Sequence, residues 1–247
     1  MSCHFVRWTS TEAPPNLQRL PDELISSTDG FSAKRRERYL KSRMLLAEMM
    51  FYFFGYPLLP KLLVSPDGRP YFADPNLPSF SLGYAGNTIA IVLSEEGSVG
   101  IDIEIVHVRS NNQAPADMQP QTLAEKAWIE AQHDPLEAAT QLCTIRHSLM
   151  KIPRSNEYRA ENLQLHPASG RLRSNCLPAV EVMSDIDDYL AWACAHVPTL
   201  NRLIMWTYTT DTGMKKSGEI VHQQRQSLRY MKLTSHTAEK PTSVIPQ

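Results

Sequence analysis

The sequence has no excess of charge of either sign, and this absence sets the first limit on its function. Its 247 residues include 25 Lys and Arg against 26 Asp and Glu, which gives a formal net charge of -1. A protein whose whole surface is built to bind nucleic acid carries a clear positive excess. We therefore expect no nucleic-acid partner, although these totals leave room for a local cluster of charge.

Cysteine is scarce, and several common catalytic motifs are missing. The four cysteines, at positions 3, 143, 176 and 194, form no C-x-x-C pair and no zinc spacing. We expect them to be free thiols in a reducing compartment. The eight histidines form no H-x-x-x-H pair, and neither G-x-x-x-x-G-K-[ST] nor G-x-S-x-G occurs. These absences argue against a histidine metal site, a phosphate-binding P-loop and a serine-hydrolase turn.

Long apolar segments are also missing. The most apolar run, residues 44–60, is interrupted by Glu48, Gly55 and Pro57 and is shorter than the ~20 residues of a membrane span. The first residues show no basic stretch followed by an apolar one, so no signal peptide is predicted. We expect a cytoplasmic protein with no membrane partner.

The order of the predicted elements indicates an α+β fold made of two similar halves. Leu40, Met44, Ala47, Phe51 and Phe54 recur at helical spacing and predict a helix that follows Ser32 and ends before Gly55. Further helices are expected at 122–132 and 135–151, a loop at 109–121, and strands at 4–9, 79–82, 88–94, 99–105, 162–166, 180–183, 189–196 and 203–208. This order suggests an N-terminal half, 1–98, a C-terminal half, 99–211, and a loosely attached tail, 212–247.

The segment Gly100-Ile101-Asp102-Ile103-Glu104 carries the sharpest chemical signal. Side chains alternate along a strand, so Ile101, Ile103 and Ile105 should face the core, while Asp102 and Glu104 project together from the other face. Two carboxylates on one rigid strand can hold Mg²⁺, which takes its other oxygens from water or a substrate phosphate. The alternative is a half-exposed strand that shows its charges to water.

A basic helix start provides a second signal. Residues 34–43 hold six cations and one acid, and Arg36 and Arg43 share a face because they are seven residues apart. Their guanidinium groups could grip phosphates. The alternative is a solvated helix face.

Two further segments could contribute to a site. The turn Gly68-Arg69-Pro70 and the segment 80–86 place small residues where a ligand could approach backbone N–H groups, although an ordinary hairpin explains them equally well. In the helix 135–151, Leu142, Ile145 and Leu149 should face the core, while Cys143, His147 and Lys151 share another face.

Taken in order, these segments resemble an Sfp-type 4'-phosphopantetheinyl transferase of the holo-acyl-carrier-protein synthase superfamily, as a divergent member. The resemblance runs from about residue 35 to 151, with weaker support to about 208. It implies a pseudo-twofold pair of α/β halves with coenzyme A between them, and Mg²⁺ on Asp102 and Glu104. It also implies that Arg43 and Arg69 hold the nucleotide and its phosphates. The family's Ser-His pair falls on Gly83 and Tyr84, so Tyr84 supplies a hydrogen bond but no positive charge.

The second departure lies in the helix 135–151. The family pattern W-[ST]-x-K-E-x-x-x-K here reads Cys143-Thr144-Ile145-Arg146-His147-Ser148-Leu149-Met150-Lys151. His147 thus stands where the family has a glutamate that completes the metal site and helps to deprotonate the acceptor. A neutral imidazole with an ordinary pKa near ~6.5 could still act as a general base. Lys151 is retained and could stabilise or protonate the leaving phosphate.

The resemblance implies transfer of 4'-phosphopantetheine from coenzyme A to a serine of an acyl- or peptidyl-carrier protein, with Mg²⁺. Two other functions stay open at this point. One is a coenzyme A-binding family member without catalytic activity, because His147 replaces the glutamate. The other is an interaction module whose basic helix docks an acidic partner.

Overall fold

The computed structural model describes residues 3–10, 15–106, 122–152, 163–174, 179–221 and 227–235. Its helices are α1 (Asp22–Ser26), α2 (Ala33–Phe54), α3 (Leu123–Glu130) and α4 (Pro135–Met150), with a short 3₁₀ helix, η3 (Pro167–Ser169). Its strands are β1 (Cys3–Thr9), β2 (Leu62–Val64), β3 (Pro70–Phe72), β4 (Ser79–Ala85), β5 (Thr88–Ser94), β6 (Ser98–Ile105), β7 (Leu163–His166), β8 (Arg171–Ser174), β9 (Glu181–Asp187), β10 (Leu190–Val197), β11 (Arg202–Thr209), β12 (Gly213–Val221) and β13 (Met231–Thr234). This mixed content agrees with the predicted α+β class.

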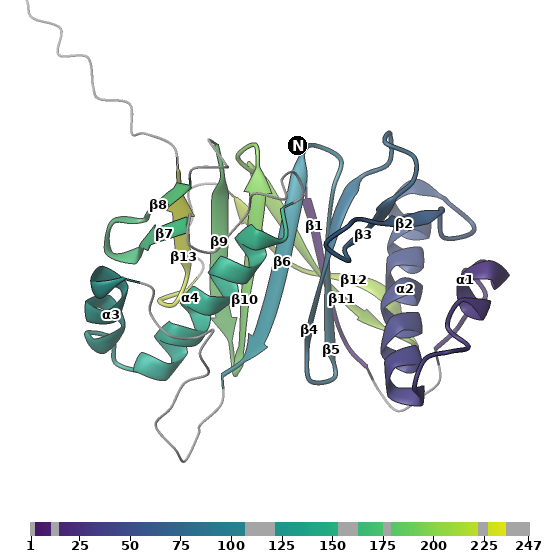
Figure 1. The fold of residues 1–247 in the computed structure, drawn as a ribbon, viewed down its shortest axis with the longest axis horizontal. Coiled ribbons are helices and arrows are strands. Elements are labelled where there is room, and N and C mark those ends of the chain that lie inside the picture. Colours follow the sequence, from purple (N-terminus) through teal and green to yellow (C-terminus); the bar gives the residue numbers. More distant parts are fainter. Residues whose placement is uncertain are drawn as a thin grey trace, which may run out of the picture.

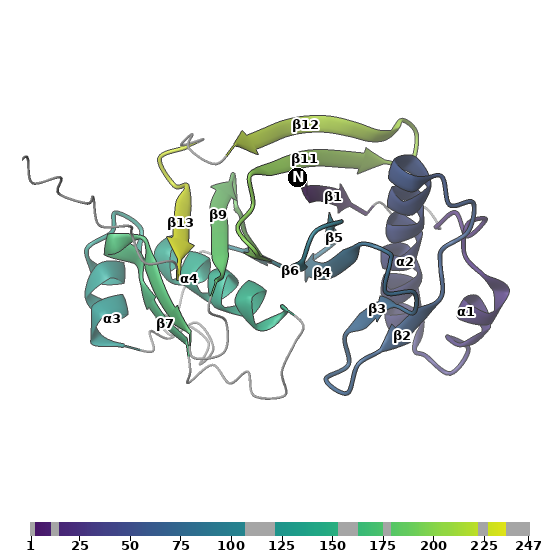
Figure 2. The ribbon, with the colours of Figure 1, turned by 90° about the horizontal axis from the view of Figure 1, so that it is seen from above.

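Two sheets form the centre of the molecule. The first has the order β12-β11-β1-β5-β4, and the second has the order β6-β10-β9-β13-β8-β7. Helix α2 lies against the first sheet and α4 against the second, on opposite sides of the pair of sheets (Figures 1 and 2). The strands β2 and β3 form a small separate hairpin. The result is a helix–sheet–sheet–helix arrangement.

The alternation of side chains along the strands divides the core into three layers. In β1, Val6 and Trp8 pack with α2, whereas Phe5 lies between the two sheets. In β6, Ile101 and Ile103 also lie between the sheets. Successive strand residues point to opposite faces, so Asp102 and Glu104 of β6 face α4. This orientation places the predicted carboxylates against the predicted helix 135–151.

Helix boundaries follow local signals in the sequence. Gly55 ends α2 in the left-handed conformation, with φ of 75°. Asp134 caps α4 by accepting hydrogen bonds from the backbone N–H groups of Leu136 and Glu137. The prediction that Phe51 belongs to the buried apolar stripe of this helix was wrong. Phe51 is 43% exposed, and the Arg19 guanidinium covers its ring. No helix among the described residues has the length and apolar character that crossing a bilayer requires.

The expected tail is wrong where it is described. Strand β12 pairs with β11 in the first sheet, and β13 lies between β9 and β8 in the second sheet, with Leu233 fully buried. Strand β11 also returns to the first sheet beside β1, so the two predicted halves of the chain do not each build one sheet. No pattern in the sequence predicted α1, β2, β3 or β8. The predicted loop 109–121 and residues 236–247 lie outside the described residues.

Candidate active site

Helix α4 packs directly on β6 because Gly100 has no side chain. A Cβ atom at this position would overlap the carbonyl oxygen of Ser148 and would lie 3.2 Å from Cβ of Lys151. Leu142, Ile145 and Leu149 fill the core beneath α4, as predicted. The close approach brings the other face of the helix onto the carboxylates of β6.

Lys151 and Asp102 form the tightest contact of the site. The Nζ atom of Lys151 lies 2.6 Å from Oδ1 of Asp102, and it also donates to the carbonyl oxygens of Ile101 at 2.9 Å and Leu82 at 3.2 Å. An ammonium group has three donors, so these three acceptors use all of them. Leu82 belongs to the first sheet and Ile101 to the second. Lys151 therefore holds Asp102 in place at the seam between the sheets.

His147 lies on the other side of Asp102. Its Nδ1 atom is 3.4 Å from Oδ2 of Asp102, and the Cys143 sulfur is 3.8 Å from each ring nitrogen. The contact with the Asp102 carboxylate, followed by the contact with Cys143, raises the pKa of His147 to about 10 against the opposing effect of burial. The ordinary pKa expected from the sequence is therefore wrong, and in the metal-free chain the imidazole carries a proton at neutral pH.

Asp102, Glu104 and His147 could hold a metal ion together. Each offers one ligand atom, and these atoms all lie within 4.8 Å of one another. The Asp102 side chain is only 9% exposed, and apart from the 3.4 Å contact with His147 its Oδ2 has no hydrogen-bond partner among the described residues. A buried carboxylate oxygen with so few partners is costly, and a divalent cation would satisfy it. The donor set therefore fits a divalent ion, with two oxygen ligands and one nitrogen ligand.

Arg43 of α2 contacts Tyr84 of β4. Nη1 of Arg43 lies 2.9 Å from the Ser42 hydroxyl and 3.4 Å from the Tyr84 hydroxyl, and its guanidinium stacks on Tyr39. The Arg38 guanidinium lies over the Tyr84 ring, 4.1 Å from the ring centroid. Arg43 is buried, and no carboxylate among the described residues forms an ion pair with it. A buried guanidinium without a counterion is suited to an anionic ligand.

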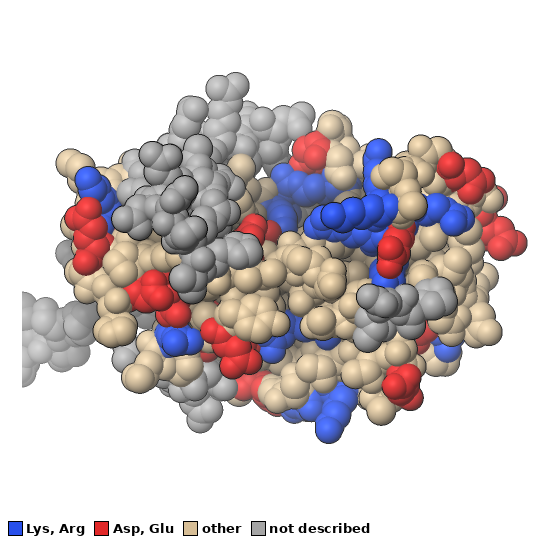
Figure 3. Space-filling view, turned by 90° about the horizontal axis from the view of Figure 1, so that it is seen from below, with Lys and Arg blue, Asp and Glu red and all other residues tan. Residues whose placement is uncertain are grey.

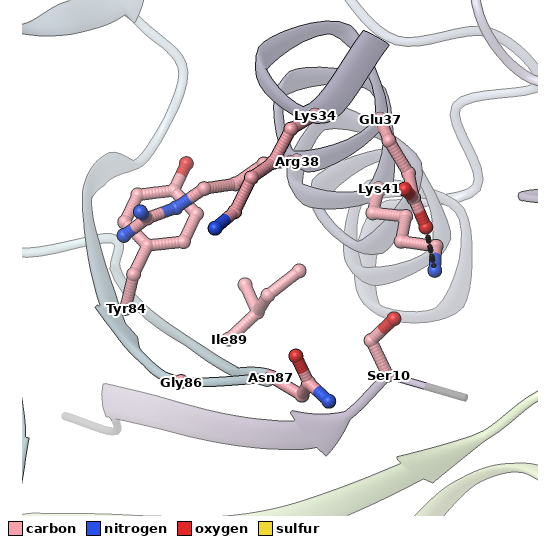
Figure 4. Close-up of a pocket in the computed structure, with 9 residues that line it drawn as sticks. All are labelled: Ser10, Lys34, Glu37, Arg38, Lys41, Tyr84, Gly86, Asn87 and Ile89. Atoms are coloured by element: carbon pink, nitrogen blue, oxygen red, sulfur yellow. Dashed lines mark ion pairs between the residues drawn. The ribbon is translucent and has the colours of Figure 1, made fainter. Parts of the chain in front are cut away.

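Tyr84 also borders a cavity of about 230 Å³ between α2 and the β4–β5 turn. Lys34 and Arg38 reach across this cavity from α2, and Lys41 pairs with Glu37 at 2.6 Å (Figure 4). Lys and Arg side chains also gather on the face seen from below in Figure 3. The basic side chains that the sequence predicted at the start of α2 thus lie partly at a cavity and partly on the surface.

Arg69 borders a second and larger cavity of about 420 Å³, together with Lys151 and the aromatic and proline residues of 70–80. Nη2 of Arg69 pairs with Asp67 at 2.6 Å, while its Nη1 is buried and has no hydrogen-bond partner in the part of the chain that the structure describes. Gly83 plays a different part: a Cβ there would lie 3.4 Å from Ile103 and 3.5 Å from Cα of Asp102. These are ordinary van der Waals distances, so Gly83 lies beside the strand that carries the carboxylates without being required there by packing.

Arg36 does not join these residues. Its Nε donates to Thr28 at 3.0 Å, and its Nη2 lies 3.8 Å from Asp29. Both partners belong to the segment before α2, and no pattern in the sequence predicted that this segment contacts Arg36. Arg146, which replaces the first lysine of the family pattern, is buried in a pair of 2.8 Å contacts with Glu125. That pair joins α3 to α4 and so helps to position the helix that carries His147.

Comparisons with known proteins support part of this picture. The uncharacterized protein YieE of Escherichia coli strain K12 is 37% identical over 224 residues, which cover 89% of this chain and 90% of YieE. The 4'-phosphopantetheinyl transferase AcpT of the same strain is 35% identical over 120 residues, which cover 47% of this chain and 57% of AcpT. AcpT of Salmonella typhi is 34% identical over 114 residues, or 46% of this chain and 55% of that protein. No protein-family model matches the chain. The likeness to AcpT indicates a relationship to phosphopantetheinyl transferases over about half of the chain.

Proposed function

This chain belongs to the same family as the uncharacterized protein YieE, and from that premise we propose that it transfers 4'-phosphopantetheine from coenzyme A to a serine of an acyl- or peptidyl-carrier protein. The observation that carries the proposal is the convergence of His147 and Lys151 of α4 on Asp102 of β6. The partial likeness to AcpT supports the reaction class. The proposal includes membership of the Sfp-type superfamily, the pseudo-twofold relation of its halves and a cytoplasmic location.

Coenzyme A would be held by its phosphates. Arg43 offers a buried guanidinium without a carboxylate partner among the described residues, and Arg69 offers a buried Nη1 at the 420 Å³ cavity. Charge-assisted hydrogen bonds to phosphate are stronger than neutral ones, and a guanidinium can make two of them at once. Tyr84 would add a neutral hydrogen bond from its hydroxyl. We place part of the nucleotide in this larger cavity.

Asp102 and Glu104 would hold a divalent cation, with Mg²⁺ as the ion that the family resemblance implies. Such a cation neutralises the charge that builds up on a diphosphate during transfer. Lys151 keeps Asp102 oriented through Oδ1 and leaves Oδ2 for the cation. In this proposal Lys151 also contributes a positive charge beside the diphosphate.

The transfer itself breaks the phosphoanhydride bond of the coenzyme A diphosphate and forms a phosphoester bond to serine. The serine oxygen bonds to the phosphorus of the phosphopantetheine group, the bond from that phosphorus to the bridging oxygen breaks, and 3',5'-ADP leaves with the bridging oxygen. The serine proton goes to a base of the site or to water. His147 has two candidate roles here, as that base or as a ligand of the cation, and its position 3.4 Å from Oδ2 of Asp102 favours the ligand role.

The test is the mass of an apo carrier protein after incubation with coenzyme A, divalent cation and this chain. We expect an increase by one phosphopantetheine group, and loss of that increase in Asp102→Asn. Asp188→Asn is the matched control, because Asp188 is exposed in the β9–β10 turn with φ of 53°, a conformation that Asn also accepts.

The two other functions give different results in the same experiment. A chain that binds coenzyme A in calorimetry but modifies none of several carrier proteins is a coenzyme A-binding protein without this activity. A chain that neither modifies a carrier protein nor binds coenzyme A contradicts the proposal altogether. That result would favour an interaction module that uses the basic start of α2.

A further inference from the structure

We infer that the centre formed by Asp102, Glu104 and His147 selects a first-row transition ion such as Mn²⁺ over Mg²⁺, with His147 as the residue that sets this preference. The inference deepens the proposed function, since it names the cation of the same site. It rests on the ligand atoms that the fold brings together.

Asp102 presents one defined ligand atom to the centre. Its Oδ1 accepts a hydrogen bond from Lys151 at 2.6 Å, whereas its Oδ2 has no hydrogen-bond partner among the described residues. The residue is 6% exposed, so water does not readily take that place. Oδ2 is therefore a buried anionic oxygen that faces the centre, with the His147 ring as a neighbour at 3.4 Å.

A ring nitrogen lies beside this oxygen. Nδ1 of His147 lies 3.4 Å from Oδ2 of Asp102, a separation that two ligands of one ion can have. Glu104 extends from the same face of β6, and one of its carboxylate oxygens completes a set in which all three ligand atoms lie within 4.8 Å of one another. The centre thus offers two carboxylate oxygens and one imidazole nitrogen.

The chemistry of this donor set determines which ion it prefers. Mg²⁺ is a hard ion that prefers oxygen ligands and keeps several waters. Imidazole nitrogen binds first-row transition ions more strongly, and their affinity for mixed nitrogen and oxygen sites rises from Mn²⁺ toward Cu²⁺. Replacing an oxygen by a nitrogen therefore weakens the site for Mg²⁺ relative to Mn²⁺.

The experiment measures metal binding alone, with no coenzyme A or carrier protein present. The full chain is titrated with Mn²⁺, the signal of free Mn²⁺ is followed by electron paramagnetic resonance, and Mg²⁺ is added as competitor. We expect Mn²⁺ to bind more tightly than Mg²⁺. Pulsed measurements on the bound ion should show coupling to a histidine nitrogen. No binding of Mn²⁺, or equal affinity for the two ions, would overturn the inference and leave Asp102, His147 and Lys151 as an ion-pair network.

Three variants sharpen the test. In His147→Glu an oxygen replaces the nitrogen, so the preference for Mn²⁺ over Mg²⁺ should shrink and the nitrogen coupling should vanish. In His147→Ala the affinity for Mn²⁺ should fall by roughly 10- to 100-fold or more, since even loss of an outer partner of a metal ligand costs that much. His133→Ala is the matched control, because His133 is exposed between α3 and α4. Circular dichroism establishes that each variant is folded.

These results are separable from the proposed transfer reaction. Suppose that the parent chain modifies a carrier protein equally well with either ion and has the same ion preference as His147→Glu. This result would overturn the inference and keep the proposed function. A chain that prefers Mn²⁺ through His147 but modifies no carrier protein would keep the inference and contradict the proposed function.

Discussion

Gly100 of β6 lies directly beneath the carbonyl group of Ser148 in α4, so close that a Cβ atom on Gly100 would overlap that oxygen. This contact sets the distance between the strand that carries Asp102 and Glu104 and the helix that carries His147 and Lys151. The glycine of the motif Gly100-Ile101-Asp102-Ile103-Glu104 is thus required by packing.

Replacing this glycine should disturb both stability and the site. In Gly100→Ala the helix α4 must move away from β6, which should lower the free energy of unfolding by about 1–3 kcal/mol. The affinity for a divalent cation should fall with it. Urea unfolding and metal titration measure the two effects. Gly218→Ala in strand β12 is the control, since its new Cβ would have no neighbour closer than 3.9 Å. Equal effects of the two substitutions would contradict this role of Gly100.

Three arginines should differ in their contribution to coenzyme A binding. Arg43→Ala should weaken binding by roughly 1.5–3 kcal/mol, because its guanidinium is buried and would lose charge-assisted contacts. Arg69→Ala should cost less, because that side chain is 35% exposed and partly screened. Arg36→Ala should leave the affinity unchanged, since Thr28 and Asp29 hold Arg36. Titration calorimetry distinguishes the three. An effect of Arg36→Ala equal to that of Arg43→Ala would show that this placement of the basic helix is wrong.

Lys151 should contribute to stability through Asp102. Lys151→Met removes the cation from a mostly buried carboxylate and two donors from the seam between the sheets, so we expect a loss of about 1–3 kcal/mol in the free energy of unfolding. Adding Asp102→Asn should recover part of the loss, because the unpaired charge is then removed. Chemical unfolding of the two single variants and the double variant gives the coupling free energy between Lys151 and Asp102. A double variant whose loss equals the sum of the single losses would contradict the pairing.

His4 should make stability depend on pH on the acidic side. Burial, and after it the charge of Arg202, lowers the pKa of His4 to about 4. The neutral ring accepts a hydrogen bond from the Trp206 indole at 3.1 Å and stacks on Phe53. The unfolded chain takes up this proton near pH ~6.5. The contribution of His4 is therefore complete above that pH and is lost as the pH falls toward 4, by at most about 1.4 kcal/mol per pH unit.

Unfolding in urea at several pH values between 4 and 7.5 tests this dependence. His4→Gln keeps a hydrogen-bond acceptor but does not titrate, so its stability should fall less steeply between pH 6.5 and 4 than that of the parent. His196, whose pKa burial also lowers, acts in the same direction in both proteins. Parallel curves for the parent and the variant would contradict the role of His4.

The parts of the fold that depend on a local sequence pattern could be predicted. Helix α2 follows from Leu40, Met44 and Ala47 at helical spacing and from Gly55 at its end. Strand β6 follows from its alternating isoleucines, and the same alternation placed Asp102 and Glu104 on one face. These patterns work because periods of 3.6 and 2 decide which side chains can be buried together.

The remaining features depend on contacts between distant segments. Strand β13 has only four residues and is stabilised by pairing between β9 and β8, so its own sequence gives little signal. Arg36 looked equivalent to Arg43 on the helix, but Thr28 and Asp29 of the preceding segment bind it. The pKa of His147 depends on Asp102, which is distant in sequence and adjacent in space. Residue type and spacing alone do not contain this information.

In the proposed function, Asp102 and Glu104 bind a divalent cation together with the diphosphate of coenzyme A. Titration calorimetry of coenzyme A with and without the cation, on the parent and on Asp102→Asn with Glu104→Gln, tests it most directly. The double substitution preserves the shape of both side chains and removes both charges. We predict that the cation tightens coenzyme A binding to the parent and has no effect on the folded double variant. The same cation dependence in both proteins would show that the two carboxylates are no more than a charged strand face.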